Sequence, residues 1–390
     1  MHITQVTPRF PPAIGGVEEH VYRVSVELAR RGHRVTVITA NEVNHTIPPV
    51  KKETVDGVEI HRFSLFMPKI FREYWLIPGI LKSLPYLKAD VVHVHGYRCL
   101  SSFTAICLAH FEGTPVVFTP HGIYPPRSPA NAFLKAVFDS TLGRFMLNFS
   151  DKIIALTEHN KQLLLQIGAS KEKISIVPNG VNLEEFINIK RKDKQKAIEE
   201  LNANGPTLLY VGRIDWNKRI EKVVEAMPLI LKKFPSAKFV IVGPDYGNYA
   251  NKLRKLGERL KVKHALIIKG GIPRKKLLAL YSIADVFLMP SSYEGFGLSL
   301  LEAMSSKIPV IVSPSGGPGD ILTHGVHAWL LKEANAIEIS EAVNLILTDK
   351  KLRESIVQNA FELVEKRYTW ESVVDKLELV YKQVIKNKRR

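Results

Sequence analysis

Two carboxylates and two glycines share one short segment in the second half of the chain. Seven residues separate Glu294 from Glu302, and Gly295 and Gly297 lie between them, after a buried strand expected to end at Met289. We expect a helix to start near Gly297, and the free N–H groups at a helix start attract phosphate. Glycine lets the backbone approach a phosphate without a Cβ clash, whereas carboxylates accept hydrogen bonds from sugar hydroxyls. The segment therefore predicts a site for a nucleotide sugar.

Two cations follow the first strand of the second half. Arg213 comes directly after Gly212, and Lys218 lies five positions further on. Arginine offers a planar fork of donors and lysine a mobile point charge, so both can bind one diphosphate. A cation pair that neutralises a departing diphosphate does the work that a metal ion does elsewhere. We therefore expect this pair to bind the leaving group.

These residues resemble the motifs of retaining glycosyltransferases of family 4, above all the Glu-Gly-Phe-Gly-Leu sequence that begins at Glu294 and is followed by Glu302. The resemblance covers nearly the whole chain, and its motifs follow the family order. It implies an α/β fold of two doubly wound Rossmann-like domains facing a deep interdomain cleft, the GT-B architecture. It also implies transfer of a hexose from a nucleotide-diphosphate sugar to an acceptor hydroxyl, with retained anomeric configuration and no metal or other cofactor.

The same resemblance implies a role for each matching residue. Glu302 would hold the ribose hydroxyls of the donor, and Glu294 the hydroxyls of its sugar. The diphosphate would bind to the side chains of Arg213 and Lys218 and to the backbone at the start of the helix. The expected donor-binding set also includes Gly16, Gly212, Ile272, Gly295, Phe296, Gly297 and Leu298.

Two motifs in the first half complete the resemblance. Gly16 follows the first strand in a loop similar to the Gly-Gly-Val-Glu loop of the family, which borders the donor phosphates and the acceptor. His121 ends a later strand, where the residues of a crevice lie in open α/β sheets. A matching histidine of the family faces the donor sugar. We therefore expect His121 to act with Arg213, Lys218 and Glu294 as the catalytic set.

His93 and His95 raise the question of a metal. They lie two positions apart on one expected strand and so face the same side. Zinc takes three or four ligands, and no third ligand at a suitable spacing is evident. We therefore expect a strand end at the cleft, with a small contact role for His95 and no metal site.

The charge of the chain is its most unusual bulk property. Its 390 residues include 55 Lys+Arg and 38 Asp+Glu, a formal net charge of +17. The excess is concentrated in segment 252–276, with ten basic residues and one acidic residue, and in the tail 382–390, with five basic residues. No recognisable nucleic-acid-binding module accompanies this charge. It therefore favours attraction of an anionic donor by the second half, or a solvated helix face, over binding of nucleic acid.

Short apolar runs alternate with helical patterns along the chain. Nearly continuous Val/Ile runs are typical of parallel strands covered on both faces. We expect strands at 3–6, 35–39, 91–95, 116–118, 153–156, 174–177, 207–211, 238–242, 265–268, 286–289 and 309–312. A helix is expected from Val17 to Arg31, ended by Gly32, because glycine reaches positive φ at little cost.

The order of these elements predicts two domains. Residues 1–180 form an expected acceptor-binding domain and residues 181–365 a nucleotide-sugar-binding domain, divided after Pro178-Asn179-Gly180. A final helix at about 366–390 needs a partner surface for its apolar side and is expected to pack back on the first domain. That side consists of Trp370, Val373, Val374, Leu377, Val380 and Tyr381.

Other functions on a similar architecture fit the same sequence less well. Two Rossmann-like halves also suit an NAD-dependent oxidoreductase, but a Gly-x-Gly-x-x-Gly loop after a first strand, with an acidic residue about 20 positions on, is not clear. A glycan phosphorylase shares a similar architecture, but no pyridoxal-lysine motif is recognisable. Cys99 and Cys107 are the only cysteines, which excludes a disulfide framework and favours a reducing compartment.

The substrates stay open at this stage. UDP-, GDP- and ADP-linked sugars all fit as donors, and a glycan, a lipid or a small molecule as acceptor. We expect the first-domain surface, including the aromatic stretch from Phe71 to Ile77, to decide the acceptor. No apolar run reaches the length of about 18 residues that spans a membrane. We expect a cytoplasmic protein and leave open peripheral contact with the inner face of the membrane through segment 61–90 or the tail.

Overall fold

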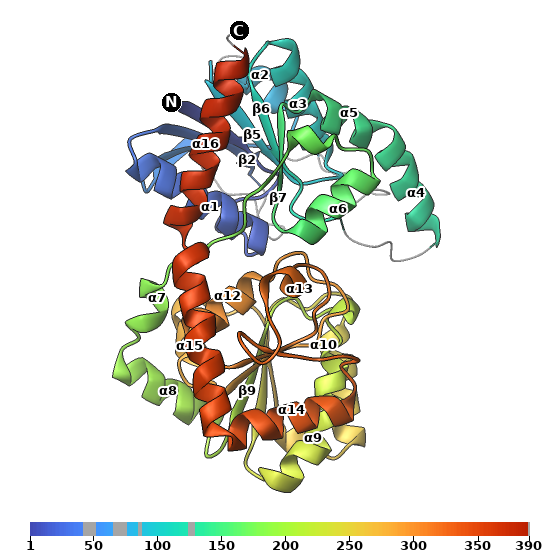
Figure 1. Cartoon of the computed structure of the whole chain (residues 1–390), viewed down its shortest axis with the longest axis vertical. Helices are drawn as coiled ribbons and strands as arrows, with labels where there is room; N and C mark the ends of the chain where they lie inside the picture. Colours follow the sequence, from blue (N-terminus) through green and yellow to red (C-terminus); the bar gives the residue numbers. More distant parts are fainter. Residues whose placement is uncertain (42–51, 65–75, 85–87, 124–128, 389–390) are drawn as a thin grey trace. The chain divides into compact units, whose positions relative to one another are not determined.

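The chain folds into two compact units. The computed structural model describes all residues except 42–51, 65–75, 85–87, 124–128 and 389–390 (Figure 1). One unit comprises Met1–Asn179 together with Trp370–Arg390, and the other comprises Gly180–Thr369. Both are built from a mostly parallel sheet with helices on its faces. The aromatic stretch 71–77, expected to decide the acceptor, lies largely outside the described residues.

The first unit is built on an eight-stranded sheet in the order β3-β4-β2-β1-β5-β6-β7-β8. Its strands are β1 (His2–Val6), β2 (Arg34–Ala40), β3 (Lys52–Val55), β4 (Val58–Phe63), β5 (Val91–His95), β6 (Val116–Thr119), β7 (Lys152–Ala155) and β8 (Ile174–Ile176). Its helices are α1 (Gly16–Arg30), α2 (Ile80–Ser83), α3 (Leu100–Phe111), α4 (Pro129–Ser140), α5 (Leu142–Phe149), α6 (Glu158–Gln166), the short η2 (Lys171–Lys173) and α16 (Trp370–Lys388).

The expected strands of this unit are present, and helix α1 ends before Gly32, whose φ is 83°. The hairpin of β3 and β4 was missed, because polar residues interrupt the apolar pattern of β4. Arg62 in β4 is buried, and its guanidinium donates to Glu53 and to the carbonyl of Pro11, each at 2.6 Å. Partners elsewhere in the chain therefore bind the guanidinium of a residue whose charge suggests a loop in the sequence.

The second unit is built on a six-stranded parallel sheet in the order β11-β10-β9-β12-β13-β14. Its strands are β9 (Thr207–Val211), β10 (Lys238–Val242), β11 (Leu266–Lys269), β12 (Val286–Met289), β13 (Val310–Val312) and β14 (Trp329–Leu330). Its helices are α7 (Glu184–Ile187), α8 (Arg191–Leu201), η3 (Trp216–Lys218), α9 (Ile220–Lys233), α10 (Tyr249–Arg259), η4 (Lys263–Ala265), α11 (Arg274–Tyr281), α12 (Leu298–Ser305), α13 (Gly317–Ile321), α14 (Ala336–Thr348) and α15 (Lys350–Arg367). The edge strand β14 was not expected from the sequence, because two residues carry no pattern.

Each sheet reverses its strand order once. In the first unit the chain builds outward from β1 through β2 and then returns to β5 on the other side of β1. In the second unit it builds outward from β9 through β10 and returns to β12 on the other side of β9. In open α/β sheets, ligands bind outside the carboxyl ends of the strands at such a switch point. We therefore expect a ligand-binding site at the loops after β1, β5, β9 and β12.

The last helix belongs to the first unit (Figure 1). Helix α15 ends at Arg367 and α16 begins at Trp370, so the expected single helix from about 366 is broken at Tyr368 and Thr369. The six apolar residues predicted to share one side of this helix are all buried. Helix α16 packs against α1, β5 and β6. Ion pairs at its edge, such as Arg31 with Asp375 at 2.6 Å, fix it to the end of α1.

The loop after β10 gives a test of this architecture. Gly243 has a φ of 145°, and a Cβ atom there would collide with the carbonyl oxygen of Gly212 in the loop after β9. We expect Gly243→Ala to lower the free energy of unfolding by at least about 2 kcal/mol, measured by urea denaturation. Gly270→Ala is the matched control, because nothing lies within 4 Å of a Cβ atom at that position. Equal effects of the two substitutions would contradict this close approach of the two loops.

Candidate active site

Hydrogen bonds join the loops that follow β9 and β12. The carbonyl of Asn217, in the turn η3, accepts two bonds of 2.9 Å from Ser292, one from its N–H and one from its hydroxyl. Asp215 caps the same turn, because its carboxylate accepts from the N–H of Trp216 at 2.7 Å. The predicted cation loop and the predicted carboxylate loop therefore lie side by side at the switch point of the second sheet.

A third loop holds Glu294 from the other side. The N–H of Glu294 donates to the carbonyl of Ser315 at 3.2 Å, and its own carbonyl accepts from Gly317 at 2.9 Å. Gly316 between them has a φ of 79°, and a Cβ atom there would collide with the carbonyl oxygen of Glu294. Glycine is thus required where the loop after β13 crosses the backbone of Glu294.

The central contact of the site is an ion pair between the two predicted loops. The ammonium of Lys218 donates to Oε2 of Glu294 at 2.6 Å, and the Lys218 side chain is only 6% exposed. A buried ammonium is stable only when a partner compensates its charge. Because an ammonium has three donors, Lys218 can keep Glu294 and still bind a phosphate oxygen. The structure thus brings together two residues that the sequence placed 76 positions apart.

Arg213 lies in the same loop as Lys218. Its carbonyl accepts from the buried hydroxyl of Tyr210 at 2.8 Å, and its guanidinium lies 5.6 Å from the ring centre of Tyr246. Burial, with the charge of Glu294, raises the pKa of Tyr210 well above its usual value. Arg213 acts on the same hydroxyl in the opposite sense. Arg213 and Glu294 therefore both lie near the hydroxyl of Tyr210.

The predicted phosphate cradle is formed by the start of α12. Gly297 precedes the helix with a φ of 91°, a conformation that favours glycine. Phe296 is buried, and its ring centre lies 6.0 Å from that of Tyr368. Gly295 and Leu298 flank these two positions, so the first N–H groups of α12 belong to a loop that packing holds in place.

Glu302 is held by two side chains of α11. Oε1 pairs with the guanidinium of Arg274, and Oε2 accepts from the hydroxyl of Tyr281 at 2.8 Å. Arg274 also pairs with Glu185 at 3.0 Å. Burial and the charge of Glu302 raise the pKa of the Tyr281 hydroxyl well above its usual value, so it donates rather than ionises. Ile272 lies two positions before Arg274, in the loop between β11 and α11.

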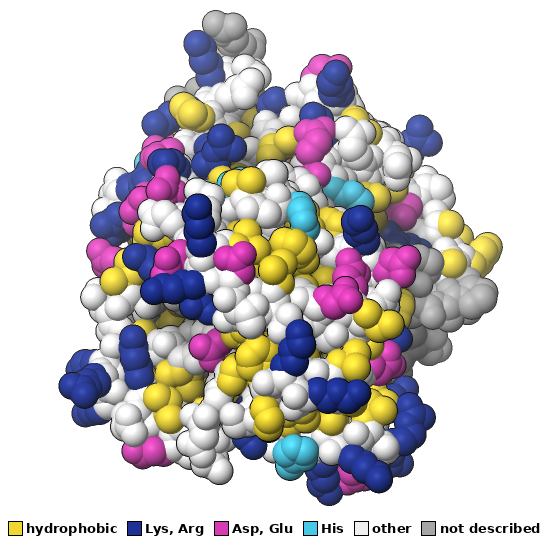
Figure 2. Space-filling view, turned by 60° about the horizontal axis from the view of Figure 1, so that its bottom comes forward, with side chains coloured by type: hydrophobic (Ala, Val, Ile, Leu, Met, Phe, Trp, Pro, Cys, Tyr) yellow, Lys and Arg dark blue, Asp and Glu magenta, His cyan; other side chains and the backbone are white. Residues whose placement is uncertain are grey.

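Tyr281 was not predicted from the sequence, and Arg274 was expected only as one member of the basic cluster after Ile272, a plausible contact of the donor. The basic run that includes it, segment 252–276, is partly neutralised by acidic residues around it. Lys275 pairs with Asp193 at 3.2 Å, Lys276 pairs with Glu200 at 3.5 Å, and Lys263 pairs with Glu258 at 2.7 Å. Figure 2 likewise shows Asp and Glu side chains scattered among Lys and Arg on the face it presents. Of this run, Arg274 is the residue that reaches a predicted donor-binding side chain.

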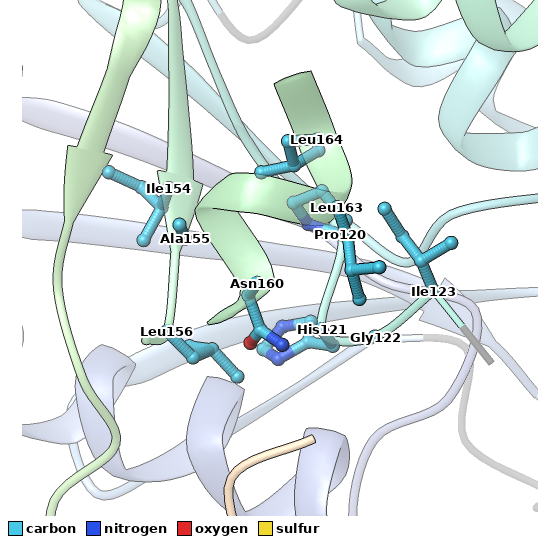
Figure 3. Close-up of a pocket in the computed structure, with 10 residues that line it drawn as sticks. All are labelled: Pro120, His121, Gly122, Ile123, Ile154, Ala155, Leu156, Asn160, Leu163 and Leu164. Atoms are coloured by element: carbon cyan, nitrogen blue, oxygen red, sulfur yellow. The ribbon is translucent and has the colours of Figure 1, made fainter. Parts of the chain in front are cut away.

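In the first unit, His121 follows β6 in an unusual backbone conformation. Its φ is 61°, a left-handed value that costs a non-glycine residue free energy and often marks functional positions. It lines a small pocket with residues of β7 and α6 (Figure 3). Asn160, which sequence reasoning missed, directs its carboxamide toward His121, and its buried Nδ2 has no hydrogen-bond partner among the described residues (Figure 3). A single polar residue in the first turn of a helix carries too little signal to be noticed in the sequence.

Three further histidines lie beside His121. His95 donates from Nε2 to the side-chain oxygen of Gln5 at 2.6 Å, which leaves its Nδ1 to accept from Nε2 of His121 at 2.8 Å. His20, in α1, donates from Nδ1 to the side-chain oxygen of Asn179 at 2.8 Å. The ring centre of His93 lies 4.1 Å from that of His95, as expected for two residues on one strand face, and the rings are tilted by 40°. The chain from Gln5 to His121 fixes which nitrogen of His121 carries the proton.

The expectation that no third ligand accompanies the strand histidines was wrong in one respect. The ligand nitrogens of His20, His95 and His121 all lie within 4.8 Å of one another. Residues far apart in sequence thus form a set with the composition of a metal site. Two of these nitrogens are already joined by the bond between His95 and His121.

Helix α16 completes this histidine cluster. The hydroxyl of Tyr381 bonds to Nδ1 of His93 at 2.6 Å, and the opposite nitrogen of His93 bonds to the hydroxyl of Thr119 at 2.7 Å. The ring of Trp370 lies edge-on to His20, with 5.6 Å between centres. The final helix therefore fixes the positions of the strand histidines as well as covering the core.

Gly16 is the first residue of α1, directly after the loop that follows β1. Behind it, the buried carboxylate of Glu18 pairs with Arg9 at 3.3 Å. Gly16 and His121 belong to the first unit, whereas Gly212, Arg213, Lys218, Ile272, Glu302 and the segment Glu294–Leu298 belong to the second. The predicted residues are therefore divided between the two units.

Comparison with known proteins decides the family. Residues 14–185 match the model described as Glycosyltransferase Family 4, and residues 191–363 match Glycosyl transferases group 1. An uncharacterized glycosyltransferase of Methanocaldococcus jannaschii is 31% identical over 98% of both chains. The chain belongs to glycosyltransferase family 4. This glycosyltransferase is also 25% identical to the glycogen synthase of Mycobacterium tuberculosis, over 98% of its own length and 94% of that protein.

Solved structures place the glycosyltransferase in the GT-B fold expected from the sequence. Sucrose-phosphate synthase from Thermosynechococcus elongatus superimposes with a TM-score of 0.78 at 21% identity, covering 99% of both chains. Anabaena Alr3699/HepE in complex with UDP superimposes with a TM-score of 0.76 at 19% identity, over 98% of this chain and all of that one. The alternative of an oxidoreductase is not favoured by these matches. Within the described residues, no helix has both the length and the apolar composition to cross a membrane.

The buried histidines predict a pH dependence of stability. Burial lowers the pKa of His20 to about 4, and lowers those of His93, His95 and His121 well below the usual value of 6.5. Below about pH 6.5 the unfolded chain binds protons that the folded protein rejects, so the free energy of unfolding falls as the pH falls. We expect a loss of on the order of 1 kcal/mol per pH unit for each such histidine, measured by urea denaturation between pH 7 and pH 4.5.

The variant His20→Gln isolates one of these groups. It removes one titrating imidazole, so its stability should fall less steeply between pH 6.5 and pH 4.5 than that of the unmodified protein. His264→Gln, at an exposed position, is the control and should leave the slope unchanged. An unchanged slope in His20→Gln would show that His20 is not buried in its neutral form.

Proposed function

We propose that this glycosyltransferase transfers a sugar from a nucleotide-diphosphate sugar to an acceptor hydroxyl, with retained anomeric configuration and without a metal ion. The observation that carries the proposal is the 2.6 Å pair of Lys218 and Glu294 at the switch point of the second sheet. It places a cation for phosphate and a carboxylate for hydroxyls in direct contact, beside the glycine-rich start of α12. A nucleotide sugar carries those two kinds of group next to each other.

Each part of the donor has a partner in this proposal. Lys218, Arg213 and the N–H groups at the start of α12 bind the diphosphate. Glu294 accepts hydrogen bonds from the sugar hydroxyls, and Glu302 accepts them from the ribose. Arg274 and Tyr281 hold the Glu302 carboxylate in one orientation, which reduces the entropy lost on binding. His121, whose Nε2 is engaged by His95, offers Nδ1 to a sugar hydroxyl.

The reaction follows from these contacts. The bond between the anomeric carbon and the phosphate oxygen breaks, and its electron pair leaves with the diphosphate. The acceptor oxygen forms a new bond on the same face of the sugar, and its proton passes to the departing phosphate oxygen. Lys218 and Arg213 stabilise the negative charge that develops on the diphosphate, which is the largest electrostatic demand of the step.

The donor is proposed to be a UDP-, GDP- or ADP-linked sugar. UDP-glucose is the first donor to test, because Anabaena Alr3699/HepE was solved in complexes with UDP and with UDP-glucose. The acceptor is proposed to be a glycan, a lipid or a small molecule with a free hydroxyl. Nucleic acid is not among the proposed partners. The protein is proposed to act in the cytoplasm, with room for peripheral contact at the inner face of the membrane.

Glu302 tests the donor site. We expect Glu302→Ala to weaken the binding of UDP-glucose, or of whichever nucleotide sugar binds the unmodified protein, by at least about tenfold, because hydrogen bonds to a charged group are lost. Isothermal titration and thermal shift measure this change. Glu362→Ala is the control, because Glu362 on α15 bonds to its helix neighbours Gln358 and Lys366. Unchanged affinity in Glu302→Ala would place the ribose elsewhere.

The stereochemistry and the metal requirement are tested in one assay. Transfer is followed by NMR of the anomeric proton, first in buffer with EDTA and then after addition of magnesium or zinc. We expect the product to keep the anomeric configuration of the donor, and the rate to be the same in all three conditions. An inverted product, or activity that EDTA abolishes and a metal ion restores, would overturn the respective part of the proposal.

A further inference from the structure

Three neighbouring helices of the first unit expose large apolar side chains. Phe111 at the end of α3 is 77% exposed, Phe133 on α4 is 71% exposed, and Phe145 on α5 is 52% exposed. Val137 and Leu134, on the same stretch of α4 as Phe133, are 44% and 39% exposed. Helix α5 packs against both α3 and α4. Five of the sixteen large hydrophobic residues exposed in the described part of the chain therefore lie on one helical layer.

Ring contacts join the α3 and α5 parts of this surface. Phe149, at the end of α5, lies 5.7 Å between ring centres from Phe145 on one side and 5.7 Å from Phe111 on the other. His110 stacks on Phe149 at 4.4 Å. Helix α4 lies at the right-hand margin of the first unit in Figure 1, and hydrophobic side chains also appear at that margin in Figure 2, which is turned about the horizontal axis. Contiguous exposed apolar patches of this kind mark interaction sites, whereas single exposed residues do not.

Cations border the same helices. Arg144 is exposed on α5 beside Phe145. Lys173 donates to the carbonyl of Asn148 at 2.6 Å, which places its ammonium next to Phe149. Lys388, near the end of α16, pairs with Asp151 at 3.3 Å, so this basic residue of the tail lies close to the end of α5. Segment 131–173 carries six basic and four acidic residues, and the tail 382–390 adds five basic residues and no acidic one.

Exposed aromatic side chains bordered by cations favour an anionic membrane as the partner. Aromatic side chains insert at the boundary between head groups and acyl chains, and each nearby lysine or arginine adds attraction to anionic lipid. Pairing with a second copy of the chain would bring the two basic borders together, and like charges oppose such contact. The apolar surface and its charge therefore suit an anionic bilayer better than self-association.

We propose that the outer face of α3, α4 and α5, together with Lys382, Lys386 and Lys388 near the end of α16, docks the protein on an anionic membrane surface. The sequence pointed to segment 61–90 or the tail for such contact; the described structure adds the aromatic surface beside the tail. Docking would supply lipid-borne hydroxyl acceptors, a consequence that rests on the proposed function. The docking itself is a binding property and is measured without donor or acceptor.

Flotation of the full-length protein with lipid vesicles tests the proposal. We expect the protein to bind vesicles in which about one lipid in three is phosphatidylglycerol and the rest phosphatidylcholine. Binding to vesicles of pure phosphatidylcholine should be at least about tenfold weaker. The double variant Phe133→Ser/Phe145→Ser should reduce binding to the anionic vesicles by at least about tenfold, because two aromatic anchors are removed. Raising the salt concentration should weaken binding of the unmodified protein.

The double variant Ile337→Ser/Ile187→Ser is the matched control. These two residues are 63% and 55% exposed, and they lie on α14 and α7 of the second unit. Thermal unfolding and hydrolysis of the nucleotide sugar should be unchanged in both double variants, which separates a failed membrane site from a misfolded or inactive enzyme. Absence of vesicle binding by the unmodified protein, or equal losses in the two double variants, would overturn the proposal. A concentration-dependent dimer that Phe133→Ser/Phe145→Ser disrupts, without vesicle binding, would also overturn it and assign the surface to a second copy.

Discussion

The buried ion pair of Lys218 and Glu294 is the contact on which the arrangement of the second unit depends. Its two partners come from the loops after β9 and β12, which meet at the point where the strand order reverses. Removing either charge would leave the other buried without compensation, and that is costly. Gly316 lets the loop after β13 cross the backbone of Glu294 closely, and Gly243 lets the loop after β10 approach Gly212. The strand order therefore sets the position of the site, and the ion pair and these close approaches constrain the composition of its loops.

In the first unit, the main constraint is that several imidazoles stay uncharged in a buried environment. Burial lowers the pKa values of four histidines. Hydrogen bonds to oxygen or nitrogen acceptors fix which ring nitrogen carries the proton in His20, His95 and His121. Gln5 orients His95, which in turn orients His121. Tyr381 extends this order to the last helix, since its hydroxyl bonds to His93. His121 is thus held both by its left-handed backbone conformation and by its hydrogen bond to His95. These two constraints suit a residue that must present one ring nitrogen in a fixed direction.

The net charge takes a different meaning in the folded protein. The run 252–276 looked like a source of attraction for the donor, yet Lys263, Lys275 and Lys276 are paired with acidic residues of the same unit. Arg274 is used at short range, to hold Glu302. Lys388 of the tail, by contrast, pairs with Asp151, two positions after the end of α5. Local partners therefore decide what each cation does, because a Coulomb interaction in water is weak beyond a few ångströms.

The sequence by itself determined the two parallel sheets, the carboxylate and cation loops and the family, because these features are written in local periodicity and in short motifs. Strands β3, β4 and β14 escaped prediction, since Arg62 of β4 finds its partners elsewhere in the chain and the two residues of β14 form no pattern. The ion pair of Lys218 and Glu294, the support of Glu302 by Tyr281 and the joining of His20 and His121 to His95 were decided by tertiary structure alone. Hydrogen bonds and ion pairs act over about 3 Å, and only the fold brings residues that are dozens of positions apart within that distance.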